Sequence, residues 1–251
     1  MTRLLRAAVL LALWMLALPA WADDEIALRG ALSQGGLARG EAPPGTTLAL
    51  DGRPVRVAPD GRELTQEIAL GRRDYQIQRI DGLPPQMVTP DPALLERIQR
   101  ETKKIRTART TDSDQLFFEA KLEWPVTGPI SGVYGSQRIL NGEPRAPHLG
   151  VDIAAPAGTP IKADGAGTVT LAESDLYFTG GTLIIDHGYG LSSIYQHMSR
   201  LDVAVGQHVE QGETVGAVGA TGRVTGAHLH WGMNWYEVAI DPQLIVGPMP
   251  K

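Results

Sequence analysis

The second half of the chain is divided into short apolar runs by closely spaced glycines, and this spacing leaves little room for anything but strands. Apolar runs of roughly four to eight residues that are bounded by glycine turns are typical of β-strands. Short turns join antiparallel neighbours, so we expect an antiparallel sheet or sandwich without a long helix. The predicted strands are residues 130–134, 151–154, 159–163, 167–171, 182–186, 191–197, 214–218 and 227–235.

The region at 25–80 also has the pattern of short strands, and Asp51-Gly52 between two alternating runs is a strong hairpin signal. Another strand is predicted at 66–70. The pattern predicts a small all-β module of sandwich type. This module contains no histidine, so we expect a spacer or a stabilising module rather than a metal site.

A proline- and glycine-rich linker is predicted at residues 81–90. Asp91 then stands at an N-cap position and Pro92 at the first helical position, which predicts a helix that runs to about residue 107. The fold class is therefore all-β with one linker helix. We expect four parts: a signal peptide at 1–22, an N-terminal β-module at 23–88, a linker with a helix at 89–123, and a C-terminal domain at 124–251.

The first residues have the composition of a secretory signal peptide. Arg3 and Arg6 precede an apolar run at 7–18, and Ala20-Trp21-Ala22 supplies a cleavage site after Ala22. A retained membrane anchor is the weaker alternative, because the apolar run is shorter than the ~20 residues that a span needs. No later stretch has the composition of a membrane span. We therefore expect a soluble periplasmic protein without a transmembrane segment in its mature form.

The composition limits the chemistry that the chain can carry out. It contains no cysteine, which excludes disulfides, thiolate nucleophiles and a lipid anchor on cysteine. The formal net charge of −5 argues against a nucleic-acid partner. Any metal site must therefore be built from histidines and carboxylates.

A His-x-His pair, His228 and His230, lies on one of the predicted strands. Side chains alternate across a strand, so both imidazoles should project from one face while Leu229 and Trp231 pack on the other. The pair alone is a weak motif, since two solvent-facing histidines would give the same pattern. All six histidines of the chain lie in this C-terminal half, at positions 148, 187, 197, 208, 228 and 230.

A second motif places His148 four residues before Asp152. Gly150 and the β-branched residues around it favour an extended chain, in which four residues span roughly 13 Å. His148 must therefore lie on a loop that bends back if it is to meet Asp152 at one ion. Two imidazoles and one carboxylate form a known ligand set for Zn²⁺ that leaves one position open for water.

Three further residues are less informative. His187 follows Asp186 in a predicted hairpin loop, and His208 lies in a turn, so we assign both to structural roles. Asn141 lies in a short loop before the first motif, where a plain turn residue is favoured over a gate for the site. His197 ends a predicted strand and can reach the site if the sheet curls over it.

Together the motifs resemble the lysostaphin or LytM-type zinc endopeptidases that cut peptidoglycan. The matching segments are His148-x-x-x-Asp152, Tyr195-Gln196-His197-Met198 and His228-x-His230. The surrounding sequence is also similar at residues 147–156, 206–216 and 218–222. The resemblance covers about residues 124–242, roughly half of the chain. The N-terminal module resembles, more loosely, a domain that some exported members carry.

The resemblance implies a zinc endopeptidase domain at 124–251 that acts on peptidoglycan. It implies one Zn²⁺ ion held by His148, Asp152 and His230, with His197 and His228 as catalytic residues off the metal. One of the two would take a proton from water and pass it to the leaving amine, and the other would donate to the oxyanion. The sequence leaves open which does which. Activity is expected to fade below about pH 6, as both would become cationic.

Two alternatives remain. A non-catalytic relative that binds cell-wall material or activates an amidase would have lost one or more metal ligands, and none is missing here. The glycine-rich segment at 205–222 has a spacing similar to that of biotinyl or lipoyl carriers, but a carrier needs a lysine at a hairpin tip. Lys162 is the only lysine between Trp124 and Pro250. The expected partner is therefore peptidoglycan; protein partners, oligomeric state and the bond that is cut stay open.

Overall fold

The computed structural model describes residues 29–250, apart from residue 32 and residues 42–46, 51–52, 58–61, 66–72 and 83–84. The predicted signal peptide at 1–22 and the predicted strand at 66–70 lie outside the described residues. In the described part of the chain, no helix is long and apolar enough to span a membrane.

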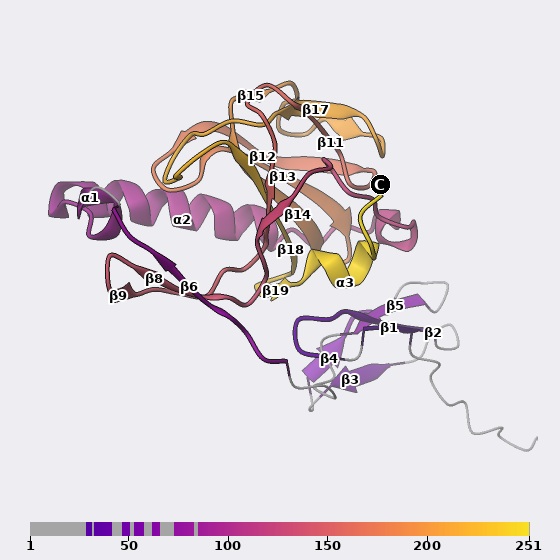
Figure 1. Ribbon diagram of the computed structural model, residues 1–251. Helices are drawn as coiled ribbons and strands as arrows, with labels where there is room; N and C mark the ends of the chain where they lie inside the picture. Colours follow the sequence, from indigo (N-terminus) through magenta and orange to yellow (C-terminus); the bar gives the residue numbers. More distant parts are fainter. Residues whose placement is uncertain are drawn as a thin grey trace, which may run out of the picture.

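The main sheet lies in the C-terminal half, and its described strands are all paired antiparallel, as predicted (Figure 1). Several strands are longer than the apolar runs indicated, because polar residues continue the ladder beyond the core. In sheet order, the eight strands found in the described residues are β16 (His208–Val209), β12 (Gly167–Leu176), β13 (Gly180–Gly188), β14 (Leu191–Met198), β18 (His228–Trp235), β10 (Val151–Ala154) and β7 (Ile130–Gly132), with β19 (Val238–Ile240) paired to β18.

Apolar side chains cover both faces of this sheet. On one face, Tyr195 and Trp231 belong to the largest buried cluster. A small sheet covers that face and contributes Ile161 and Val215 to the same cluster. Alternation along β14 sends Ile194 to the opposite face. The small sheet consists of β11 (Pro160–Lys162), β17 (Thr214–Ala217) and β15 (Arg200–Leu201).

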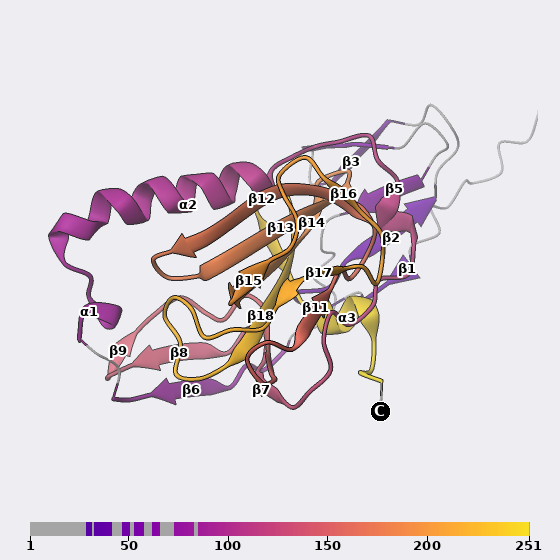
Figure 2. The ribbon, with the colours of Figure 1, turned by 90° about the horizontal axis from the view of Figure 1, so that it is seen from above.

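The predicted helix lies against the second face of the sheet. Helix α2 (Leu95–Arg109) follows a short 3-10 turn, η1 (Pro92–Leu94), and Asp91 caps it by accepting a hydrogen bond from the Ala93 N–H at 2.8 Å. The helix runs along β12 and β13 (Figure 2), with Ala108 buried against the sheet. It ends two residues later than predicted.

A strand from before the helix returns to the C-terminal half. Strand β6 (Ile77–Ile80) pairs in parallel with β8 (Gln137–Leu140), which pairs in turn with β9 (Glu143–Pro144). Figure 2 shows this ribbon well away from α2. The parallel pair and β8 were not predicted, and a short helix, α1 (Pro85–Val88), lies within the predicted linker. The ribbon brings residues 77–80 beside the site described below.

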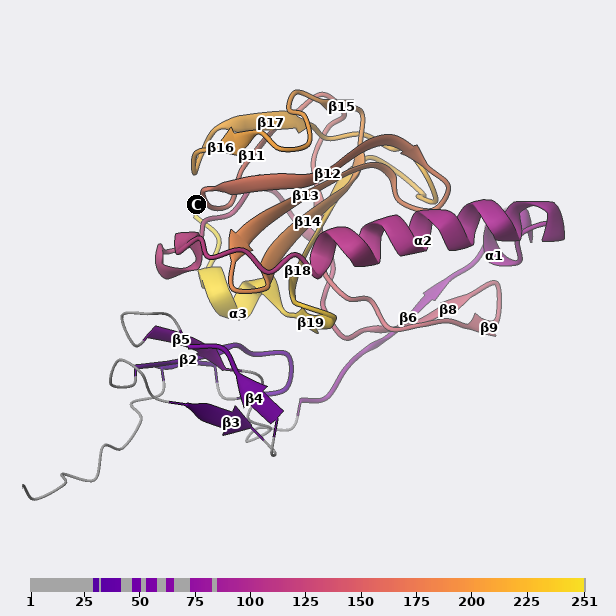
Figure 3. The same ribbon diagram turned by 180° about the vertical axis from the view of Figure 1, so that it is seen from behind.

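Before β6, the described part of the N-terminal module forms two small antiparallel sheets (Figure 3). The predicted hairpin is present, with Leu50 opposite Arg53. An ion pair of 2.8 Å joins Arg73 to Asp241 at the start of α3 (Pro242–Val246). The domain boundaries stay predictions. The two sheets contain β1 (Arg29–Gly30), β2 (Ala38–Glu41) and β5 (Arg62–Thr65), and β3 (Leu48–Leu50) with β4 (Arg53–Val55).

Candidate metal centre

The register between β10 and β18 sets Asp152 directly opposite His230. Leu229 and Trp231 are fully buried in the main core, as the alternation predicted. The core therefore forces Asp152, His228 and His230 onto the other face of the two strands. Packing of the apolar neighbours thus positions the polar side chains.

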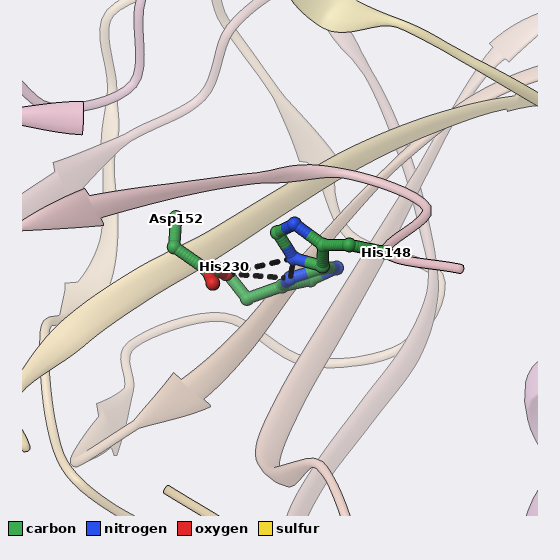
Figure 4. A group of neighbouring side chains, drawn as sticks. All are labelled: His148, Asp152 and His230. Atoms are coloured by element: carbon green, nitrogen blue, oxygen red, sulfur yellow. Dashed lines mark hydrogen bonds and ion pairs between the residues drawn. The ribbon is translucent and has the colours of Figure 1, made fainter. Parts of the chain in front are cut away.

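His148 reaches the same point from the loop between β9 and β10 (Figure 4). Its Nδ1–H donates to the carbonyl of Val133 at 3.1 Å, so in the neutral ring Nε2 carries the lone pair that faces the site. This Nε2 lies 2.8 Å from Nδ1 of His230 and 3.0 Å from Oδ1 of Asp152. The third side of the triangle, from His230 Nδ1 to Asp152 Oδ1, is 2.9 Å.

The three side chains suit a metal ion. All three are buried, and their donor atoms are two imidazole nitrogens and one carboxylate oxygen. Donors that bind one ion at about 2.0–2.2 Å must lie roughly 3 Å apart, as these do. Within the described residues, His148, Asp152 and His230 are the acidic and histidine side chains that come close enough together to hold an ion.

Two glycines make room for the ligands. A Cβ on Gly150 would lie 2.7 Å from Nε2 of His230, and one on Gly132 would lie 2.4 Å from Oδ2 of Asp152. The chain bends at Gly150, which the sequence had suggested as the place where the loop turns back towards the site. The missing side chain there also lets the His230 ring approach.

Arg138 on β8 holds the second oxygen of the carboxylate. Its Nη2 donates to Oδ2 of Asp152 at 2.7 Å, and its Nε donates to Oε1 of Gln78 on β6 at 3.2 Å. Burial by itself would raise the pKa of Asp152, but its close contacts with the His148 and His230 rings outweigh burial and hold the pKa well below its ordinary range. Asp152 is therefore an anion, as a ligand must be. Sequence reasoning missed Arg138 and Gln78, because the segment Gln137-Arg138-Ile139-Leu140 does not alternate between polar and apolar residues and gives no clear strand signal.

A β-bulge brings His197 to the ligand face. Simple alternation along β14 would place His197 on the core side with Tyr195. Between the pairs Leu183–Tyr195 and Gly181–Met198, however, β14 holds one residue more than β13, and His197 has a φ of +65°. Met198 consequently returns to the core. We expected curling of the sheet to bring His197 in, and an extra residue does so instead.

His197 and His228 lie side by side at the edge of the triangle. Their ring centroids are 4.9 Å apart, and that of His197 is 6.2 Å from that of His230. The Nδ1–H of His197 donates to the carbonyl of Thr221, and that of His228 to the carbonyl of Gly226, each at 2.9 Å. In the neutral rings both Nε2 atoms are therefore hydrogen-bond acceptors.

Burial changes the acid–base behaviour of His197. Desolvation, followed by repulsion from His230 and His228, lowers the pKa of His197 to about 3. The expectation that His197 becomes cationic near pH 6 is therefore wrong. Burial likewise lowers the pKa of His230.

The site opens into a cavity of about 440 Å³. His148, Asp152, His197, His228 and His230 all line it. Asn141 lines a separate surface cavity with Val88 and Asp91 and lies at a tight turn with a φ of +49°. This agrees with the turn assignment of Asn141.

The two remaining histidines lie away from the site. His208 is exposed, with Nε2 3.1 Å from Oε1 of Glu210. His187 was expected in a hairpin loop but lies in β13 and is completely buried. Its Nδ1–H donates to the carbonyl of Ala166 at 2.8 Å, and its Nε2 lies 2.9 Å from Oγ of Ser193. The prediction of a turn residue was wrong, because the strand extends to residue 188.

Comparison with known proteins gives consistent matches. The pattern of peptidase family M23 matches residues 146–242. Peptidoglycan DD-endopeptidase ShyA of Vibrio cholerae is 43% identical over 86 residues, which are 34% of this chain and 20% of that protein. DD-carboxypeptidase/endopeptidase Mpg of Neisseria meningitidis is 36% identical over 104 residues, 41% of this chain and 24% of that protein. The match thus spans about a fifth to a quarter of these curated relatives.

One solved structure matches over most of its length. A crystal structure from Pseudomonas aeruginosa assigned to peptidase M23 is 31% identical, with a TM-score of 0.62. The match covers 86% of this chain and 96% of that one. The chain therefore belongs to peptidase family M23.

Proposed function

We propose that the protein is a zinc-dependent endopeptidase that hydrolyses peptide cross-links or stem peptides of bacterial peptidoglycan. One observation carries this proposal: two further histidines, His197 and His228, adjoin the buried triangle of His148, Asp152 and His230. The names of the curated relatives, which describe peptidoglycan and DD-endopeptidases, support the substrate class. Such a substrate places the site of action outside the cytoplasm, and we propose the periplasm.

The residues of the triangle would hold one zinc ion. A bound zinc ion supplies Lewis-acid chemistry, polarising the scissile carbonyl and acidifying water. Val133 and Arg138 keep the ligands in orientation through His148 and Asp152. Other first-row transition metals can also bind this donor set. The elemental analysis described below therefore has to show that the bound metal is zinc.

The two remaining histidines would move and orient protons. We assign proton transfer to His228, whose Nε2 is an acceptor and which is less buried than its neighbours. His197, held neutral by its low pKa, is a poor proton acceptor but can accept a hydrogen bond from the attacking water. Neither neutral ring carries an N–H that points into the site, so the role of oxyanion donor would require a prior protonation.

The alternative of a non-catalytic regulator has less support. Such relatives have typically lost one or more metal ligands, whereas here all three candidate ligands, together with His197 and His228, line one cavity. The strained backbone of His197, a non-glycine residue with a positive φ, is also of the kind that gathers at functional sites.

The test is incubation of the mature protein with purified sacculi, with and without a chelator, followed by mass identification of released muropeptides. His230→Ala should lose both zinc binding and cleavage. His228→Ala should retain zinc, measured by elemental analysis, and lose turnover. Near wild-type cleavage by His228→Ala would refute its role, and zinc-loaded wild type that leaves sacculi intact would refute the proposed function.

A further inference from the structure

Three arginines line the cavity of the metal centre: Arg138, Arg145 and Arg223. Among the described residues that line it, Asp152 is the one carboxylate, and Arg138 is already paired with it at 2.7 Å. The wall of the cavity is therefore locally cationic, although the whole chain has a net charge of −5.

Arg145 lines the cavity and lies three residues before His148 in the chain. It follows β9, and its backbone N–H donates to the carbonyl of Arg138 at 2.9 Å. Its guanidinium donates to two backbone carbonyls, those of Pro144 at 3.2 Å and Val88 at 3.0 Å. Among the described residues, no carboxylate forms an ion pair with it. The side chain is thus held by neutral acceptors and keeps its charge uncompensated.

Arg223 also lines the cavity and lies five residues before His228 in the chain. Its backbone N–H donates to the carbonyl of Phe178 at 2.9 Å, and its guanidinium lies over the Phe178 ring at 4.3 Å from the centroid. The preceding Gly222 has a φ of +72°, and a Cβ there would lie 2.6 Å from the Phe178 carbonyl oxygen. The loop is thus built to fix Arg223 on the aromatic ring.

The arginines also interact with one another. Burial lowers the pKa of Arg223, and repulsion from Arg138 and Arg145 lowers it further. Gathering like charges in a half-buried cavity is unfavourable unless an anion joins them. Arginine is well suited to such an anion, because its planar fork binds a carboxylate through two parallel hydrogen bonds.

We propose that Arg145 and Arg223 form a subsite that binds a free carboxylate of the peptide substrate next to the bond that is cut. This inference rests on the proposed function and narrows its substrate. In a D-alanyl-diaminopimelate cross-link, the carbon that bears the leaving amine also bears a free carboxylate. An amide inside a glycine bridge has no free carboxylate beside it. The subsite therefore favours the diaminopimelate type of cross-link over the glycine bridge.

The experiment uses two synthetic peptides with a D-alanyl-diaminopimelate bond. They differ only in the carboxyl group beside the leaving amine, which is free in one and a carboxamide in the other. Zinc-loaded wild type should cleave the free acid with a kcat/KM on the order of 10- to 100-fold higher than the amide, mainly through KM. In Arg145→Gln and in Arg223→Gln this ratio should fall towards one. Arg145→Lys should restore only part of it, because lysine lacks the fork.

A matched control is Arg100→Gln, which removes an exposed arginine on α2 whose partner is Glu96. It should keep the wild-type acid-to-amide ratio. A ratio near one in the wild type would overturn the subsite while leaving the proposed function intact. The subsite would also be overturned if the arginine variants lost cleavage of both peptides equally, since this indicates a structural role.

A second measurement separates the two proposals. Calorimetry on zinc-loaded His228→Ala, alone and combined with Arg145→Gln, measures binding of each peptide without turnover. Tighter binding of the acid that depends on Arg145 would support the subsite even if the wild type cleaved neither peptide, and only the proposed function would then fail. Equal binding of acid and amide would overturn the subsite.

Discussion

Arg138 binds one oxygen of the Asp152 carboxylate and leaves the other oxygen for the two histidines. Arg138 donates to Oδ2 at 2.7 Å, and Oδ1 remains for His148 and His230 at 3.0 and 2.9 Å. Because Gln78 accepts from Nε of the same arginine, a strand from before the linker helix supports the orientation of a metal ligand. The ribbon of β6 and β8 is therefore part of the site, although the family pattern begins only at residue 146.

Replacing Arg138 by Gln should weaken zinc binding by about 10- to 100-fold, because Asp152 loses the partner that fixes its carboxylate. Competition with a chromophoric chelator measures this affinity. Arg79→Gln, which changes an exposed arginine on the neighbouring strand β6, serves as the control and should bind zinc as the wild type does. Equal affinities of the Arg138 and Arg79 variants would show that Asp152 is oriented without Arg138.

Gly150→Ala should displace the His230 ring, since the added methyl group would lie 2.7 Å from its Nε2. We expect zinc affinity to fall by at least about tenfold, as for the loss of a ligand-orienting group. The control is Gly226→Ala, where an added Cβ meets nothing within 4 Å. Its zinc affinity should stay at the wild-type value. If Gly150→Ala also kept the wild-type zinc affinity, the His230 ring would not be held as tightly against Gly150 as its close approach indicates.

The antiparallel sheet, the linker helix and the convergence of His148, Asp152 and His230 could be predicted from sequence. Strand alternation fixes the face of His228 and His230 once Leu229 and Trp231 are assigned to the core, and Asp91-Pro92 marks a helix start by local chemistry. The strand faces and the helix start depend on residues close together in the chain. The convergence of His148 and Asp152 with His230 joins segments that lie 82 and 78 residues apart, and it was expected from the family resemblance. The assignment of the three residues as zinc ligands stays a prediction.

Other features depend on long-range pairing, which periodicity does not record. The bulge that turns His197 requires one strand to hold an extra residue relative to its neighbour, and no local pattern marks it. The parallel pairing of β6 with β8, and hence Gln78 and Arg138 at the site, joins segments on both sides of α2. His187 looked like a turn residue because Gly188 follows it, yet the ladder continues through it.

The low pKa of His197 predicts acid sensitivity of the metal-free protein. The folded pKa is about 3, whereas an unfolded histidine has an ordinary value of about 6.5. Below pH 6.5 the unfolded chain therefore binds a proton that folded His197 does not, and stability falls as pH falls, by up to about 1.4 kcal/mol per pH unit, until about pH 3.

Urea unfolding of the metal-free protein at pH 7, 6 and 5 measures this loss. In His197→Gln the loss between pH 7 and 5 should be smaller by about 2 kcal/mol, since glutamine does not titrate. His208→Gln, at an exposed site, should retain the wild-type loss. The same loss in both variants would mean that burial does not depress the pKa of His197.

The buried carboxylate of Asp164 contacts residues of three strands of the main sheet, β13, β14 and β18. It accepts hydrogen bonds from the Tyr195 hydroxyl at 2.7 Å and from Trp231 Nε1 at 3.0 Å, and it lies 3.3 Å from Nε2 of His187. Burial would raise the pKa of Asp164, but His187 outweighs burial and lowers it. Burial would lower the pKa of His187, but Asp164 raises it. The two therefore form a buried ion pair on the core side of the main sheet, in contact with Tyr195 and Trp231.

Asp164→Asn should destabilise the protein by about 3–5 kcal/mol, because it leaves the buried His187 without its counter-charge. Urea unfolding at pH 6 measures this, with the exposed Asp202→Asn as a control of little expected effect. The contribution of His187 is complete below about pH 6.5 and is lost as pH rises through its raised folded pKa, so the gap between wild type and Asp164→Asn should narrow at alkaline pH. A gap that widened with rising pH would show that His187 is buried in its neutral form and that Asp164 serves only Tyr195 and Trp231.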